Sequence, residues 1–145
     1  MDRYTVVSQL LEQAWQEEVQ FLEEQPLEER ELPGRFERWS RKDVVAHIGT
    51  WNSHLAEDIC AALRGEVPLG HKDYDAENVV IFQMHCAKDW RQVFEYASQA
   101  HRRLIDAVRQ LGKEGLERTD LFPWQEGQPL WRNIGGVTFN HALIH

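Results

Sequence analysis

Apolar side chains recur at spacings of three and four residues along most of this 145-residue chain, and this period constrains its fold more than any other feature. Residues spaced in this way share one face of an α-helix, so each such segment has to bury one side against another element. No segment of useful length alternates apolar and polar residues as a half-buried strand does. The pattern therefore predicts an all-α fold.

Four regions carry the helical period, and polar residues that favour helix ends mark several of their limits. The regions are residues 5–22, 40–65, 76–111 and the segment that begins at 129 or 130. Ser40 with Asp43 forms an acidic variant of the capping box, and Asp89 with Gln92 marks a second helix start inside the third region. Gly112 ends that region. Four amphipathic helices that share apolar seams predict a four-helix bundle, expected to form one domain over residues 1–145.

Composition narrows the classes of function. The net charge is −8, with 42% hydrophobic and 28% charged residues, as in ordinary globular proteins. No run of lysine and arginine is long enough to follow a nucleic-acid backbone, so we expect no nucleic-acid partner. No segment resembles a signal peptide or approaches the ~20 apolar residues of a membrane span. The two cysteines, Cys60 and Cys86, lack metal-type spacing, and we expect reduced thiols in a cytoplasmic protein.

A His-x-x-x-His pair, His141 and His145, is the main chemical signal in the chain. Side chains four positions apart on a helix lie on one face, ~5–6 Å apart at Cβ, so two imidazoles can converge on one divalent metal ion. The candidate for a third ligand is His47, which falls inside the apolar stripe of the second helix. The alternative interpretation of His47 is a core histidine that bonds to a backbone or side-chain partner.

The other histidines have weaker patterns. His54, followed by Asp58 on the same helix, could reach a pocket, but a solvated helix face is the interpretation we favour. His71 falls in a predicted loop and carries no signal. His85 is interpreted as structural and His101 as a residue at the edge of an apolar stripe.

Three stretches resemble the DinB-like superfamily of four-helix bundles, which includes YfiT-type proteins, mycothiol-dependent isomerases and the ClbS/DfsB proteins. They are residues 39–48 (WSRKDVVAHI) followed by Trp51, residues 75–78 (DAEN), and the pair His141 and His145. They occur in the order that the superfamily has them and span most of the chain.

The resemblance implies a divalent metal ion held by His47, His141 and His145. Zinc, nickel, iron or manganese would suit this ligand set, and three protein ligands leave coordination positions open for a substrate. The resemblance thus implies an enzyme acting on a small molecule, either a transferase that uses a low-molecular-weight thiol or a hydrolase. The ClbS/DfsB branch implies an alternative, a metal-independent protein that binds or hydrolyses a reactive small molecule. A non-enzymatic, stress-related bundle is a third alternative, and the resemblance also implies a homodimer.

Overall fold

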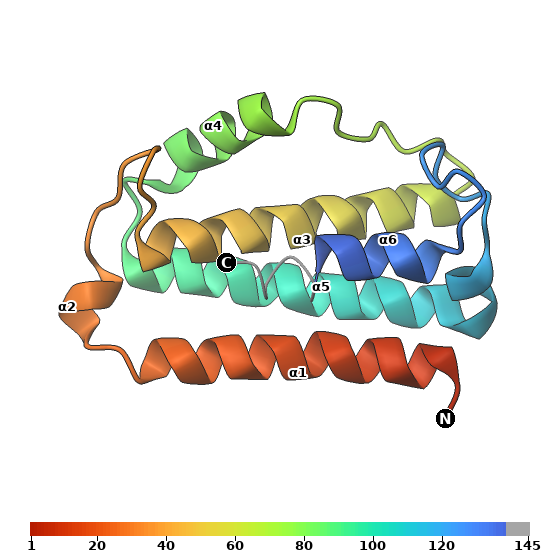
Figure 1. Ribbon diagram of the computed structural model, residues 1–145, viewed down its shortest axis with the longest axis horizontal. Helices are drawn as coiled ribbons and strands as arrows, with labels where there is room; N and C mark the ends of the chain where they lie inside the picture. Colours follow the sequence, from red (N-terminus) through yellow and green to blue (C-terminus); the bar gives the residue numbers. More distant parts are fainter. Residues whose placement is uncertain (139–145) are drawn as a thin grey trace.

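The computed structural model describes residues 1–138, and its regular structure is entirely helical (Figure 1). The helices are α1 (Arg3–Glu23), α2 (Leu27–Arg30), α3 (Arg41–Leu63), α4 (Tyr74–His85), α5 (Trp90–Glu117) and α6 (Leu130–Val137). No β-strand occurs within residues 1–138, so the all-α prediction is confirmed. Six helices replace the predicted four in this part of the chain, because the third predicted region divides into α4 and α5 and the first connection holds the short α2.

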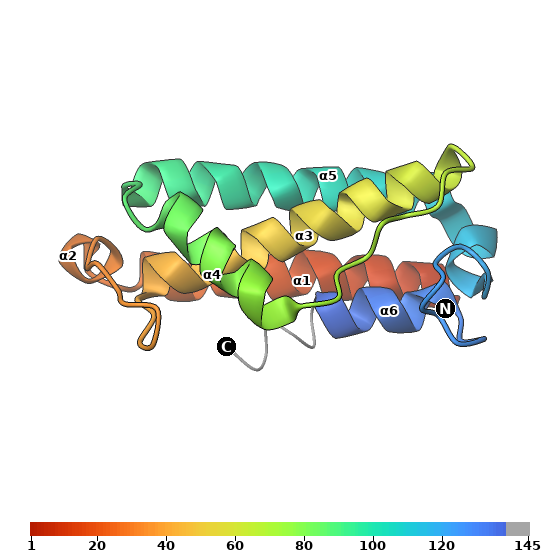
Figure 2. The same ribbon diagram turned by 90° about the horizontal axis from the view of Figure 1, so that it is seen from above.

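The long helices α1, α3 and α5 run side by side along the long axis of the molecule (Figure 1). Helix α6 packs against α3 and α5 near one end, and these four helices form the bundle. Helix α4 and the loop before it lie on the side of α3 that faces away from α1, and the view from above shows them crossing α3 (Figures 1 and 2). This crossing segment covers one face of α3 and forms the site described below.

The predicted capping box at Ser40 and the predicted helix start at Asp89 are both confirmed, and Asp89 also forms a capping box. The Ser40 backbone N–H donates to Oδ2 of Asp43 at 2.8 Å, while the Asp43 N–H donates to Oγ of Ser40 at 3.2 Å. Asp89 and Gln92 exchange the equivalent bonds at 3.0 and 2.8 Å. Each box satisfies two backbone donors that a helix start leaves open, and therefore fixes where α3 and α5 begin. Gly112, with φ of 63°, interrupts the helical backbone at the predicted place.

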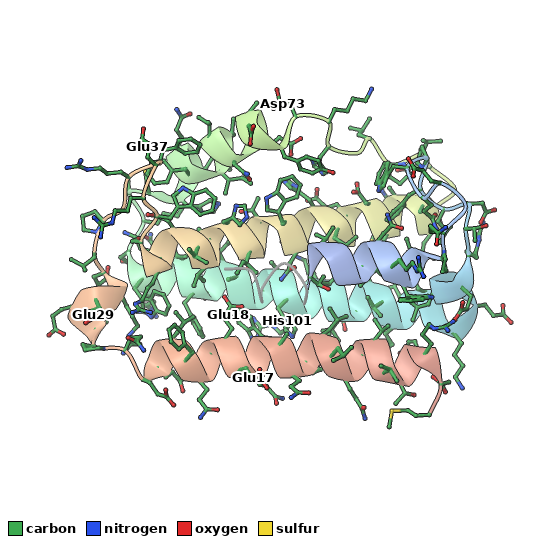
Figure 3. All side chains as sticks on the ribbon, in the orientation of Figure 1. Glu17, Glu18, Glu29, Glu37, Asp73 and His101 are labelled. Carbon is green, nitrogen blue, oxygen red and sulfur yellow. The ribbon has the colours of Figure 1, made fainter. Side chains whose placement is uncertain are left out.

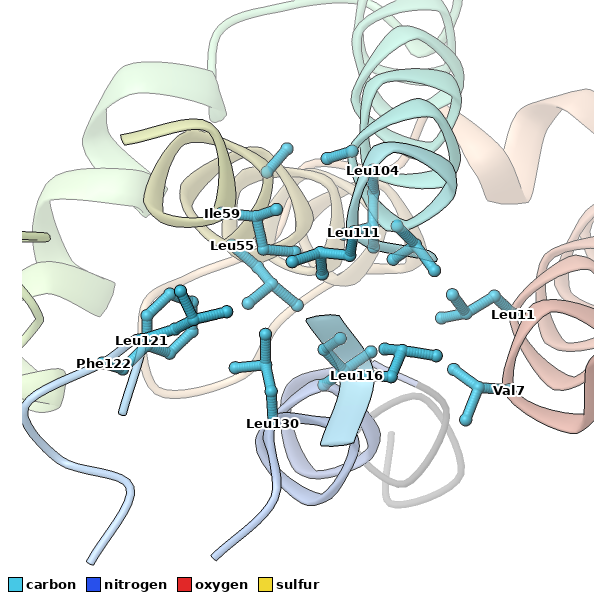
Figure 4. Packing of buried hydrophobic residues seen from close by; sticks show 14 residues of the cluster. Val7, Leu11, Leu55, Ile59, Leu104, Leu111, Leu116, Leu121, Phe122 and Leu130 are labelled. Carbon is cyan, nitrogen blue, oxygen red and sulfur yellow. The ribbon is translucent and has the colours of Figure 1, made fainter. Parts of the chain in front are cut away.

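The larger apolar core lies between the helices at the end of the molecule that holds α6 (Figure 4). It joins side chains from every long helix, such as Leu11, Ile59 and Leu104, to Leu121 and Phe122 of the loop before α6. Ile59 and Leu104 have 0% exposure, and burying a side chain of this size stabilises the fold by about 1.5–3 kcal/mol. The core therefore holds the 118–129 loop firmly against the second half of α3.

One buried glutamine fixes the conformation of that loop. Gln125 is 2% exposed, and its amide oxygen accepts from the Phe122 N–H at 2.7 Å. Its amide nitrogen donates to the carbonyl oxygens of Arg118 at 2.7 Å and Gln128 at 2.9 Å. Because a buried polar group is stable only when it is bonded, these three bonds hold the backbone around Phe122 and Trp124 in one arrangement.

Two titratable side chains lie where α1 meets the rest of the bundle, His101 and Glu18, and Figure 3 labels both. His101 of α5 stacks on Trp15 of α1, with ring centroids 5.1 Å apart. Glu18 lines a groove of about 490 Å³ between α1 and α3, where burial raises the pKa of its carboxyl group to about 7. Within the described residues no helix has the length and apolar character needed to cross a bilayer.

Candidate metal centre and the adjoining cleft

One face of α3 carries a stripe of histidine, tryptophan and aspartate side chains. His47, Trp51, His54 and Asp58 follow one another at spacings of four, three and four residues, so they lie along one side of the helix. This side faces α4 and the loop before it. The indole Nε1 of Trp51 donates to Oδ1 of Asn78 at 3.1 Å, and this bond ties α4 to α3.

Three residues from different elements come together above this stripe: His54 of α3, His71 of the 64–73 loop and Glu77 of α4. We call them the cleft cluster. One ligand atom of each lies within 4.8 Å of the other two. The His71 and His54 rings are 4.5 Å apart at their centroids, and Nδ1 of His71 is 2.5 Å from Oε2 of Glu77. Within residues 1–138, no other three histidine, cysteine or acidic side chains approach one another this closely.

The donor set of the cleft cluster fits a divalent transition metal. Zinc binds nitrogen and oxygen at ~2.0–2.2 Å, so two of its ligands in tetrahedral geometry lie roughly 3.3–3.6 Å apart. The three donor atoms already lie within 4.8 Å of one another, and side-chain movements on the order of an ångström would bring them to that spacing. Two imidazoles with one carboxylate also match the ligands of known catalytic zinc and non-haem iron sites.

Local sequence explains how Glu77 and His71 reach this place. Asp73 caps α4, and its Oδ1 accepts from the Ala76 N–H at 3.0 Å. The cap sets the start of α4 and puts Glu77 in the first turn, where the helix dipole favours a carboxylate. Gly70 has φ of 72°, a conformation that other residues rarely adopt, and this turn brings His71 back over α3.

The surroundings of His54 favour its neutral imidazole, and a further carboxyl group lies beside the cleft cluster. Burial lowers the pKa of His54, and the nearby His71 adds to this effect. Neutral imidazole is the form that binds metals. Asp58 lies with Oδ2 at 4.0 Å from Nε2 of His71, and burial raises the pKa of its carboxyl group.

A cleft of about 870 Å³ opens beside the cleft cluster. His54, Asp58 and His71 contribute to its wall, and most of the remaining lining is apolar or aromatic. The wall is built from α3, the 64–73 loop, the start of α4, the 118–129 loop and α6. Its size is within the ~300–1,000 Å³ typical of small-molecule sites.

The structure places His47 and leaves the other two predicted metal ligands outside the described residues. His47 is 3% exposed on the inner part of the α3 stripe, with its ring 4.6 Å from that of Trp39 and 6.4 Å from that of Trp51. His141 and His145 lie beyond residue 138, so the predicted triad remains a prediction.

Two interpretations of the other histidines were wrong. His54 and Asp58 do not lie on a solvated helix face, because both line the cleft and the Asp58 side chain is only 16% exposed. His71 is a member of the cleft cluster rather than an uninformative loop residue. A usable signal was the spacing of seven residues between His47 and His54, which puts His54 on the same helix face.

Comparison with known proteins agrees with this architecture. Residues 10–145 match the family model of the DinB superfamily. The chain therefore belongs to the DinB superfamily, as its second-helix and His-x-x-x-His stretches predicted. No curated protein and no solved structure gives a significant match to the chain.

Proposed function

We propose that this DinB-superfamily protein is a metal-dependent enzyme that binds a divalent ion at His54, His71 and Glu77 and hydrolyses a small molecule held in the adjoining cleft. The single observation that supports this most directly is the approach of one ligand atom from each residue to within 4.8 Å of the other two. Membership of the DinB superfamily, whose proteins often bind metal ions, supports the same assignment.

The residues of the cleft would divide the work. An ion bound by three protein ligands supplies Lewis acidity and lowers the pKa of a bound water molecule. His54 and His71 would bind the ion from the cleft wall, and Glu77 would provide the third ligand from the start of α4. Asp58 lies within the same wall, where its carboxylate can accept a proton from an attacking water molecule or orient it. A thiol-dependent transfer would need its thiol from outside, since neither cysteine lines the cleft among the described residues.

The triad of His47, His141 and His145 is a second candidate for the metal site. It is supported by the burial of His47 on the same stripe of α3 that carries His54. Seven residues of helix separate the two histidines, a rise of about 10.5 Å, with Trp51 between them. One ion cannot be bound by both histidines across that distance, so the two candidate sites can be tested separately.

Zinc titration of the full chain, without a histidine tag, tests the proposal. We expect one zinc ion per chain by calorimetry, and we expect His54→Ala and His71→Ala each to weaken its binding by about 100-fold or more. His47→Ala is the discriminating variant and His101→Ala is a control histidine outside both sites. If His47→Ala removes the zinc while His71→Ala retains it, the ion belongs to the triad and the cleft proposal is wrong.

The chelated protein tests the metal-independent alternative. A ligand that binds in the cleft with equal affinity before and after removal of zinc would favour that alternative over a metal-dependent enzyme. The predicted homodimer is a separate proposal, and light scattering at micromolar concentration measures it directly.

A further inference from the structure

We infer that the cleft selects a small aromatic molecule that carries one metal-binding group with oxygen or sulfur donors, with this group toward the cleft cluster and the ring toward Trp124. This inference rests on the proposed function, because the donor needs the ion.

Aromatic side chains from three separate segments provide the wall on which a ring would lie. Trp51 comes from α3, Tyr74 from the start of α4, and Phe122 and Trp124 from the 118–129 loop. The Trp51 and Tyr74 rings are 5.4 Å apart at their centroids, and the Phe122 and Trp124 rings are 4.9 Å apart. Two pairs of rings therefore line the same cleft.

In each pair one ring is buried and the other, Tyr74 or Trp124, is partly exposed to solvent. Trp51 and Phe122 are 6% and 3% exposed and act as packed walls, whereas Tyr74 and Trp124 are 61% and 38% exposed. Core packing does not explain an indole and a phenol left open at the mouth of a cleft. A bound ring would remove this apolar surface from water, and stacking adds to the gain.

The backbone at Gly70 supports Trp124 from one side. A Cβ atom placed on Gly70 would lie 2.7 Å from a carbon of the Trp124 ring, so the glycine backbone packs closely against the indole. The 118–129 loop is held in turn by the buried bonds of Gln125. Trp124 is therefore a positioned surface rather than a freely moving side chain.

The charges of the cleft argue against a polyanionic ligand. Lys72 is the one lysine or arginine among the described lining residues, and the carboxyl groups of Asp58 and Glu126 face the same space. Recognition of a phosphate group commonly uses arginine clamps, and no arginine is among the described lining residues. A ligand with a single ionisable donor fits this balance of charges better.

The placement of the metal ligands gives the orientation. His54 and His71 belong to the cleft wall, whereas Glu77 is not among the described lining residues. The open coordination positions of an ion at the cleft cluster would consequently face the cleft. The donor end of a ligand would reach the ion while the remainder extends along the wall toward Trp124.

Two hydroxamic acids test this inference because they share a metal-binding group and differ in the ring. With zinc-loaded protein, we expect benzohydroxamic acid to bind at least about tenfold more tightly than acetohydroxamic acid in calorimetry. Trp124→Ala should reduce this preference to within about twofold while zinc affinity is retained, and Trp124→Phe should restore most of it. Phe21→Ala, which removes a ring 51% exposed on α1, is the matched control and should keep the full preference.

The order of the measurements separates this inference from the proposed function. Zinc is titrated first without any hydroxamic acid, and failure to bind zinc overturns the proposed function together with the inference. Zinc binding followed by equal affinities for the two hydroxamic acids overturns the inference alone. A preference that survives Trp124→Ala places the ring elsewhere and also overturns it.

Discussion

A histidine lies at each end of helix α4, and the charged side chains beside the two histidines have opposite signs. At the first turn, His71 lies against Glu77, with Asp58 nearby and the His54 ring beside it. At the last turn, His85 lies among Thr50, Lys88 and Tyr96, which we call the His85 pocket. Acidic neighbours attract a cation, whereas a lysine repels one.

The His85 pocket satisfies a neutral imidazole completely. The Thr50 hydroxyl donates to the Ala46 carbonyl oxygen at 2.8 Å, so it accepts from Nε2 of His85 at 3.4 Å. This assigns the lone pair to Nδ1, which accepts from Nζ of Lys88 at 3.2 Å. Burial lowers the pKa of His85 to about 4, and the charge of Lys88 adds to this shift. A buried histidine is therefore not enough to indicate a metal site, because the charges and hydrogen bonds of its neighbours determine whether a metal cation can bind.

The largest expected effect is on zinc affinity, and it comes from placing a lysine beside His71, as the His85 pocket has a lysine beside its histidine. Glu77→Lys places an ammonium group beside His71, as Lys88 stands beside His85. We expect zinc affinity to fall by more than about 100-fold, because the variant loses a ligand and gains a like charge. Glu77→Gln should have a smaller effect, since it loses the ligand without adding the charge.

The control for that substitution is Glu114→Lys, which makes the same change of charge on the exposed part of α5. Zinc calorimetry of the three variants, with circular dichroism to check the helices, gives the comparison. Equal zinc affinity in Glu77→Lys and Glu114→Lys would show that the ion is bound elsewhere.

The next effect is on stability, and its sign follows from the pKa of His85. An unfolded histidine has a pKa near 6.5, and the folded pKa is about 4. Between these values the unfolded chain binds more protons, so this contribution is present above pH 6.5 and is lost as the pH falls toward 4. At ~1.4 kcal/mol per pKa unit, His85 should lower the free energy of unfolding by on the order of 2 kcal/mol between pH 7 and pH 5.

His85→Gln isolates this contribution, because the amide can still donate to Thr50 and accept from Lys88 but does not titrate. Urea unfolding of both proteins at pH 7 and pH 5 measures it. Other groups, such as Glu18 with its raised pKa, titrate in the same range, so the quantity of interest is the difference between the proteins. An identical loss of stability in the variant would mean that His85 is already accessible to protons in the folded state.

The same comparison explains what the sequence could and could not predict. The capping boxes at Ser40 and Asp89 were predictable because each depends on residues three positions apart. The cleft cluster was not, since His71 and Glu77 reach His54 only after the 64–73 loop returns over α3. Loop geometry of this kind depends on tertiary packing, which helical periodicity does not encode.

The smallest expected effect concerns Lys88 itself. Lys88→Gln removes the positive charge but keeps a group that can donate to Nδ1 of His85. The pKa of His85 should rise by less than about one unit, because burial is the larger cause of its shift and remains in place. Titration of the His85 ring by NMR measures this directly, with the ring of His101, which Lys88 does not influence, as an internal reference. A rise of the His85 pKa to the ordinary histidine value would instead make Lys88, and not burial, the reason that this end of α4 excludes cations.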